Sequence, residues 1–163
     1  MTAQRRYWET FSTLRRDAIY INRYHARDEH IDRSLSIFSA LASSGSIAGW
    51  VIWKEIGFIW GAVIALSQAL SAVKSYLPFR KRMSALAVLG PELEALALVA
   101  ETDWFKVGGG HLTEQEIHAL TMELKKKALR ATTKSFSGSS LPENKALLAV
   151  AEQEAAHYMS TFS

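Results

Sequence analysis

Two long stretches in the middle of the chain contain no charged residue. No Asp, Glu, Lys or Arg occurs from 34 to 53 or from 56 to 73, and only Lys54 and Glu55 separate the two stretches. As a helix, the first stretch spans about 30 Å, the thickness of the hydrocarbon layer of a bilayer. The second reaches a similar length if it continues past Lys74 to Phe79, because a lysine stem can snorkel to the interface. The pattern predicts a transmembrane helical hairpin over 34–79.

A hairpin buried in the core of a helical protein would also be apolar on all sides, so the flanking residues decide between the two interpretations. Seven arginines precede the first stretch and the basic segment 80–82 follows the second, whereas the turn has one lysine. Basic residues gather on the cytoplasmic side of a membrane, and tryptophans favour its interfaces. Trp50, Trp53 and Trp60 lie around the turn. We therefore expect a membrane hairpin with both termini in the cytoplasm.

The segment before the hairpin has the periodicity of an amphipathic helix. Its apolar positions recur at alternating spacings of four and three: Tyr7, Phe11, Leu14, Ala18, Ile21 and His25. No proline or glycine interrupts the path from this segment into the first stretch. The sequence predicts a cytoplasmic helix over 1–33 that continues into the membrane.

The segment after the hairpin, 80–163, is expected to form a cytoplasmic helical bundle. Gly90 and Pro91 are expected to interrupt it, with a helix opening at Pro91. Three glycines at 108–110 indicate a turn, and Thr113 with Glu116 forms a capping box for a helix from 114 to about 133. A last helix is expected over about 143–162. Strand patterning is absent, so the predicted fold class is all-α.

Polar side chains recur within the predicted spans. Ser36, Ser39, Ser43 and Ser46 share one face of the first span, and Gln68 and Ser71 lie in the second. They indicate either close helix packing or a partly wet path through the membrane. Both interpretations imply a homo-oligomer, with a tetramer among its candidate forms. A channel in particular must be a homo-oligomer, because two spans alone cannot enclose a path.

Two groups of basic residues are candidate sites for a phosphate-bearing ligand such as a nucleotide or oligonucleotide. One group lies on the helix after the capping box: Lys126, Lys127, Arg130 and Lys134. The other surrounds Tyr20 in the first helix: Arg16, Arg23 and Arg27. Guanidinium groups suit phosphates, and an aromatic ring among them suits a base. A solvated helix face, or contact with lipid headgroups, would need the same residues.

Little in the sequence supports catalysis. Without cysteine, the chain has no disulfide, thiolate metal site or cysteine nucleophile. The two histidines of HARDEH are five residues apart, which does not bring them together on a helix face. The glycines before His111 lack the lysine of a phosphate loop. We expect no enzyme activity, no metal site and no cofactor.

The order of these features resembles a known family. The segment WETFSTLRRDAIYINRYHARDEHIDR, with its RYHARDEHIDR approach to two closely spaced spans, looks like the SLATT family over about Tyr7 to Arg82. SLATT proteins are two-transmembrane effectors of bacterial nucleotidyltransferase and nucleotide-sensing defence systems.

The resemblance implies an anti-phage effector that assembles in the bacterial inner membrane and permeabilises it, so that infected cells stop growing or die. A nucleotide or short oligonucleotide from a partner nucleotidyltransferase would control it. Two alternatives remain open at the level of sequence. One is a holin-like or toxin-like lytic protein that needs no ligand, and the other is a membrane anchor or scaffold for a protein partner.

Overall fold

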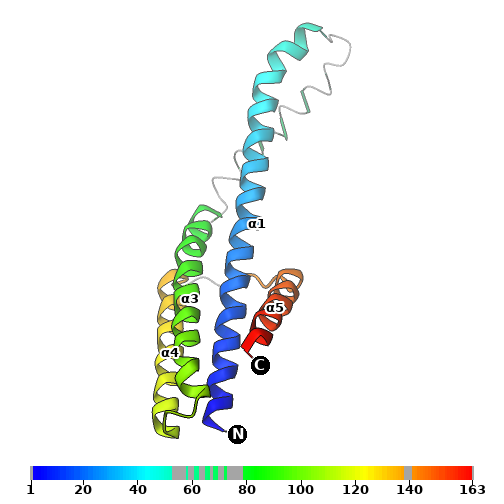
Figure 1. Cartoon of the computed structure of the whole chain (residues 1–163). Helices are drawn as coiled ribbons and strands as arrows, with labels where there is room; N and C mark the ends of the chain where they lie inside the picture. The colour runs from blue at the N-terminus through cyan, green and yellow to red at the C-terminus, as the bar shows by residue number, and fades with distance from the viewer. Residues whose placement is uncertain are drawn as a thin grey trace. The chain divides into compact units, whose positions relative to one another are not determined.

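The computed structural model describes residues 2–52, 58, 61–62, 65–66, 68–69, 72, 79–137 and 141–162, and for 42–52 and 79–80 it describes the backbone alone. The described residues form four α-helices and one 3-10 helix, and no strand occurs among them (Figure 1). Their bounds are α1 (Ala3–Ile52), α3 (Phe79–Gly108), α4 (Glu114–Ser135), α5 (Lys145–Met159) and η2 (Ser160–Phe162). The predicted all-helical class is confirmed. The uninterrupted helix expected from the amphipathic segment into the first uncharged stretch is also confirmed.

The chain divides into two compact units. Unit 1 comprises Met1–His25 and Ser84–Ser163, and unit 2 comprises Ala26–Met83. The domain boundaries expected at 33/34 and 79/80 both lie inside unit 2. Helix α1 therefore supplies its first part to unit 1 and the rest to unit 2.

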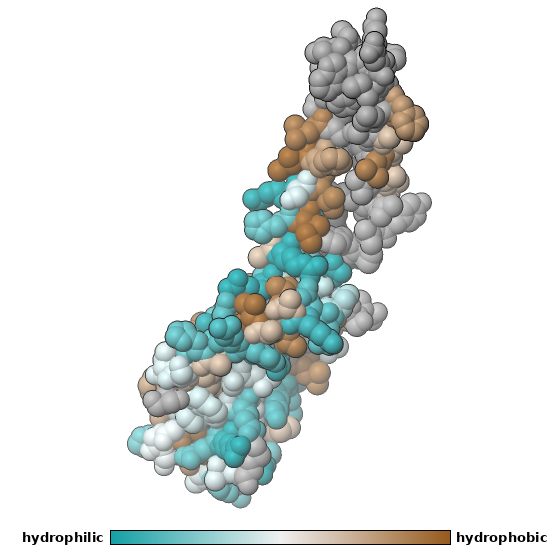
Figure 2. Space-filling model, turned by 90° about the vertical axis from the view of Figure 1, so that its right-hand side faces the viewer, coloured by the Kyte–Doolittle hydropathy of each residue, from teal (hydrophilic) through white to brown (hydrophobic). Residues whose placement is uncertain are grey.

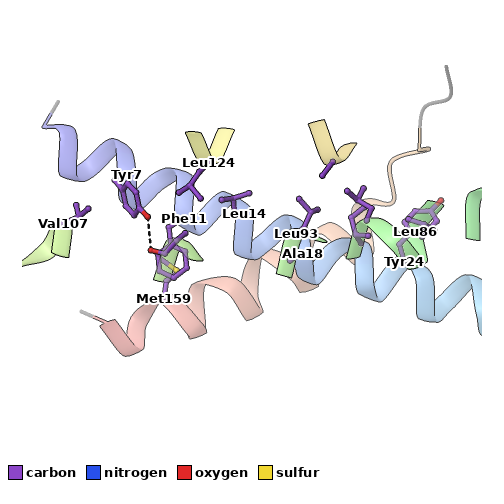
Figure 3. Close-up of a cluster of buried hydrophobic side chains, with 14 of the residues drawn as sticks. Tyr7, Phe11, Leu14, Ala18, Tyr24, Leu86, Leu93, Val107, Leu124 and Met159 are labelled. Atoms are coloured by element: carbon purple, nitrogen blue, oxygen red, sulfur yellow. Dashed lines mark hydrogen bonds between the residues drawn. The ribbon is translucent and has the colours of Figure 1, made fainter. Parts of the chain in front are cut away.

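Unit 1 is a four-helix bundle whose successive helices run in alternating directions (Figure 1). The first part of α1 lies at its centre. Five of the six apolar positions predicted for this helix are buried: Tyr7, Phe11, Leu14, Ala18 and Ile21. They meet Leu93 and Val107 of α3, Leu124 of α4 and Met159 of α5 in one cluster (Figure 3).

The sixth predicted position of that stripe was wrong. Tyr24 is buried and His25 is only partly so. The buried positions run on through Ile21, Tyr24 and Asp28, which brings the average spacing down to 3.5 residues. This heptad spacing keeps one seam of a helix facing its neighbour over several turns.

Pro91 lies inside α3, so the expectation that it opens a helix was also wrong. A proline within a helix removes the bond from its nitrogen to the carbonyl four residues earlier, here that of Ala87. Both residues are exposed, so water can reach that carbonyl. The opposite face of α3 is held by Leu86 and Leu89 before the proline and by Leu93 after it, all buried. Packing on that face outweighs the lost hydrogen bond.

Gly90 is buried where α3 approaches α1. A Cβ at this position would overlap Oδ1 of Asn22 and would lie 3.7 Å from the Ile21 side chain. Glycine thus leaves room for the exposed Asn22 side chain between the two helices. It also relieves the steric restriction that a proline places on the residue before it, because that restriction acts largely through Cβ.

The helix ends of α4 and α5 are capped by side chains. The predicted capping box is confirmed: the Glu116 amide donates to the Thr113 hydroxyl, and the Thr113 amide donates to the Glu116 carboxylate. The hydrogen bonds that the Thr113 amide and the Thr113 hydroxyl donate to the Glu116 carboxylate lower the pKa of Glu116. Asn144 caps α5 by accepting a hydrogen bond from the Leu147 amide at 3.1 Å. Helix α5 therefore starts at Lys145, slightly later than expected.

Among the described residues, one stretch is long and apolar enough to cross a membrane by length and composition: Lys81–Gly108, in α3. One third of its most apolar window is buried. Its inward face contributes to the core of unit 1, which accounts for part of this apolarity. The predicted spans at 34–53 and 56–73 fall largely on residues whose side chains lie outside the description.

The Tyr7 hydroxyl is buried at the centre of unit 1 and donates a hydrogen bond to the Ala100 carbonyl at 3.1 Å (Figure 3). Burial, with a smaller contribution from the charge of Asp103, raises the pKa of Tyr7. The folded protein therefore keeps this hydroxyl protonated at pH values where the unfolded chain ionises it. The stability that this provides is complete below about pH 10, the ordinary pKa of tyrosine, and falls as the pH rises further.

Tyr7→Phe is expected to lower the free energy of unfolding of unit 1 by about 1 kcal/mol at neutral pH, the net contribution of one hydrogen bond. It should also reduce the loss of stability above about pH 10. Denaturant unfolding followed by tryptophan fluorescence at pH 7 and pH 10.5 measures both effects. An alkaline slope identical to that of the unmodified protein would contradict the account of Tyr7.

Candidate functional site

A groove between α3 and α4 combines an apolar floor with a cationic rim. We call it the α3–α4 groove, and its volume is about 360 Å³. Its floor is aliphatic: Ala95, Leu96, Val99 and Ala131. Its rim is charged: Glu92 on α3, and Lys127, Arg130 and Lys134 on α4. All three cations belong to the group singled out from the sequence.

Helix geometry places these cations on one edge. Positions 127, 130 and 134 are three and four residues apart, so they follow one side of α4 over two turns. Lys126, the fourth predicted cation, is exposed but does not line the groove. Three of the four residues are therefore brought together, and the fourth lies on the neighbouring surface.

The rim carries more positive charge than its own carboxylates balance. Lys127 pairs with Glu123 at 2.7 Å, and Lys134 approaches Glu92 at 3.6 Å. Lys127 lowers the pKa of Glu123 through this contact. In the described part of the chain Arg130 forms no ion pair. The groove is thus suited to a negatively charged partner with an apolar face. None of its described lining residues is aromatic, so it offers no ring on which a base could stack.

The second predicted group of basic residues is engaged mainly in ion pairs within the protein. Arg16 pairs with the neighbouring Asp17 at 2.7 Å, and Arg23 pairs with Glu154 of α5. The Tyr20 hydroxyl accepts a hydrogen bond from the Asn144 amide at 3.0 Å. Arg27 belongs to unit 2 and has interactions of its own. Tyr20 and Arg23 attach α5 to α1, a role that the sequence pattern did not indicate.

The candidate pore or packing residues are described in part. The Ser36 hydroxyl donates to the Asp32 carbonyl at 2.8 Å, the bond along the helix that a serine in a span can form. Ser39 is partly buried and Gln68 is helical and exposed. The side chains of Ser43 and Ser46, and the whole of Ser71, lie outside the described residues.

A buried ion pair in unit 2 was missed by the sequence reasoning. The side chain of Asp28 is 2% exposed and accepts from Arg82, with Nε and Nη2 of the guanidinium 3.1 and 2.9 Å from the same oxygen, Oδ2. Asp28 continues the buried positions of α1 by the heptad spacing. A carboxylate at such a position requires a cation, so the spacing could have marked Asp28 as a member of an ion pair, without identifying Arg82 as its partner. It joins α1 to the beginning of α3, at the two ends of the predicted hairpin.

Other features offer less to a ligand. A hollow between α1 and α4 has charges of both signs, with Arg6 and Lys125 near Glu9 and Asp17. No group of three or more His, Cys, Asp or Glu side chains able to hold a metal ion occurs among the described residues. The α3–α4 groove is therefore the stronger candidate for binding.

Comparison of the chain with protein-family models, curated proteins and solved structures finds no match in any of the three. Its own residues are accordingly the basis for assigning a function.

Proposed function

We propose that the chain is a membrane effector whose hairpin inserts into the bacterial inner membrane and assembles into a homo-oligomer that permeabilises it. One observation carries the proposal. Beyond the part of α1 that packs in unit 1, large apolar side chains on the same helix are exposed: Ile37 (54%), Phe38 (44%) and Leu41 (65%). Figure 2 shows hydrophobic residues gathered along this part of α1.

A membrane explains this exposure better than a core does. Complete transfer of such a side chain out of water contributes about 1.5–3 kcal/mol, and about half of that remains available from each of these half-exposed residues. They also begin the 34–53 stretch, which has no charge, and Arg33 immediately precedes it. Insertion would thus bury the apolar residues and leave the arginines at the cytoplasmic interface. Basic residues that flank a span prefer that side of the membrane.

Assembly and control are further parts of the proposal. Gln68 carries donors and acceptors that need protein or water partners in a membrane, which supports a path between several hairpins. A phosphate-bearing signal, as the SLATT resemblance implies, would bind at Lys127 and Arg130 of the α3–α4 groove. The assembly would have an open and a closed state, and a ligand shifts the balance between them only by binding one state more tightly than the other. The signal therefore either opens the path or holds it closed. The organised bundle of unit 1 is more than a bare lytic hairpin requires.

Dye release from liposomes tests this function. Purified protein is expected to release the dye either with the signal present or with it absent, according to which state the signal favours. Gln68→Leu is expected to change the rate of release because it removes the polar group from the path. ATP and a short oligoadenylate serve as probes of the signal. The double substitution Lys127→Glu, Arg130→Glu should abolish the response to them, whereas the control Lys145→Glu on α5 should retain it. Absence of release under all these conditions would refute the permeabilising function.

A further inference from the structure

The outward face of α3 forms an uncharged stripe along most of the helix, apolar except for Thr102, whose hydroxyl donates to the Leu98 carbonyl. Its members are all exposed and recur at spacings of three and four: Val88, Pro91, Ala95, Leu98, Thr102 and Phe105. None of them carries a charge. Leu98 is 54% exposed and Phe105 69%. We call these six residues the α3 stripe.

The opposite face of the same helix is already buried in unit 1 through Leu86, Leu89 and Leu93. A helix that is apolar on both faces is normally covered on both. Among the described residues, α3 contains the one stretch that is long and apolar enough to cross a membrane. Its two apolar faces account for the apolarity of this stretch. The α3 stripe is therefore a surface that lacks its partner.

The spacing identifies the kind of partner. Alternating steps of three and four over six positions are the a and d positions of a heptad repeat, the seam along which one helix packs against another. In the same register Glu101 takes a g position and Lys106 the following e position. In a parallel pair of identical helices, a g residue faces the e residue five positions later on the other copy. Glu101 of one copy would then meet Lys106 of the next, and the reverse.

The charges beside the stripe select the orientation. On the side facing α4, Lys127, Arg130 and Lys134 form a cationic edge at the level of positions 92–99 of α3. On the other side lie Glu94, which pairs with Arg15, and Glu101, which accepts a hydrogen bond from the Tyr158 hydroxyl. A two-fold axis parallel to the helices places the cationic edge of one copy against the acidic edge of the other. An axis across the helices would place like edges together.

We propose that the α3 stripe is the dimer interface of this chain, and that it pairs with the stripe of a second copy in parallel. This interface would be one contact of the proposed assembly. Its parallel orientation rests on the proposed function, because copies inserted in one membrane with the same topology present α3 in the same direction. Leu98 and Phe105 form the apolar centre of the contact, and the pairs between Glu101 and Lys106 border it.

Engineered cysteines test the pairing in native membranes, because the chain has no cysteine of its own. Val88→Cys alone is expected to form a disulfide-linked dimer under mild oxidation, since parallel copies bring position 88 against itself. Met122→Cys, exposed on α4 outside the stripe, is the matched control and should stay monomeric. Addition of Leu98→Glu to Val88→Cys should abolish the dimer, and because Leu98 is exposed the fold should survive.

Charge exchange tests the same contact independently. Glu101→Lys should lower the dimerisation constant by about tenfold, because it replaces attraction with repulsion at two symmetry-related pairs. Adding Lys106→Glu should restore it.

Two results would overturn the proposal. One is crosslinking only between Val88→Cys and Phe105→Cys copies mixed together, which indicates antiparallel pairing. The other is no crosslinking of Val88→Cys in a protein that still fractionates with membranes and still releases dye. That second result would leave the proposed function intact, whereas crosslinked protein found only in the soluble fraction would refute the membrane function and support the interface.

Discussion

Arg82→Ala is expected to destabilise the connection between α1 and the start of α3 by about 3–5 kcal/mol, the usual effect of removing one member of a buried ion pair. The substitution leaves the Asp28 carboxylate, which is 2% exposed, without the two guanidinium contacts that now compensate its burial. Asp28→Ala should have a smaller effect, because the Arg82 side chain is 26% exposed and can turn its charge toward water. Amide hydrogen exchange around residue 28 in detergent micelles measures the free energy of local opening.

Arg33→Ala is the matched control for this prediction. Arg33 also pairs with an acidic residue of α1 in unit 2, Glu29 at 3.2 Å, but both side chains are at least half exposed. Such surface pairs contribute about 0.3–0.5 kcal/mol, so protection from exchange should hardly change. Equal effects of Arg82→Ala and Arg33→Ala on the free energy of local opening would contradict the claim that burial strengthens the pair between Asp28 and Arg82.

Leu41→Arg is expected to remove most of the protein from the membrane fraction. Leu41 is 65% exposed and lies in the uncharged stretch 34–53. Exchange of leucine for arginine near the middle of a span disfavours insertion by about 3–4 kcal/mol on scales derived from insertion experiments. That corresponds to more than about a hundredfold in the insertion equilibrium. Carbonate extraction of membranes, followed by immunoblotting, measures the result.

Leu129→Arg controls for a general effect of adding an exposed arginine. Leu129 is exposed to a similar extent, 68%, but lies on α4 in unit 1. This variant should stay with the membrane as the unmodified protein does. Membrane retention of Leu41→Arg would argue that the exposed apolar side chains of α1 serve contacts between proteins instead of insertion.

Local sequence signals predicted the helices of unit 1 well where one short-range rule decided the outcome. The apolar positions from Tyr7 to Ile21 required only helical periodicity, and the capping box at Thr113 required two residues three apart. Pro91 was misplaced because its rule is local, whereas packing along the opposite face of α3 spans the proline on both sides. An average spacing of 3.6 residues continues the stripe to His25, whereas the buried positions follow an average of 3.5 residues and reach Tyr24.

The candidate site was predicted only as far as spacing along a single helix could group its residues. Lys127, Arg130 and Lys134 share an edge of one helix, so spacing alone groups them. Most of the apolar floor of their groove belongs to α3, as Ala95, Leu96 and Val99, and no pattern within α4 predicts these residues. Likewise Arg23 meets Glu154 and Asp28 meets Arg82 across long separations in the chain, and a single sequence gives no direct sign of such partners.

The topology of the hairpin tests the central claim most directly. In the cysteine-free chain, Glu55→Cys places one thiol in the predicted turn, and Gln153→Cys places one on the exposed face of α5. A membrane-impermeant maleimide applied to intact spheroplasts is expected to label position 55, and to label position 153 only after lysis. Protection of both thiols until lysis, or recovery of the protein in the soluble fraction, would contradict the account.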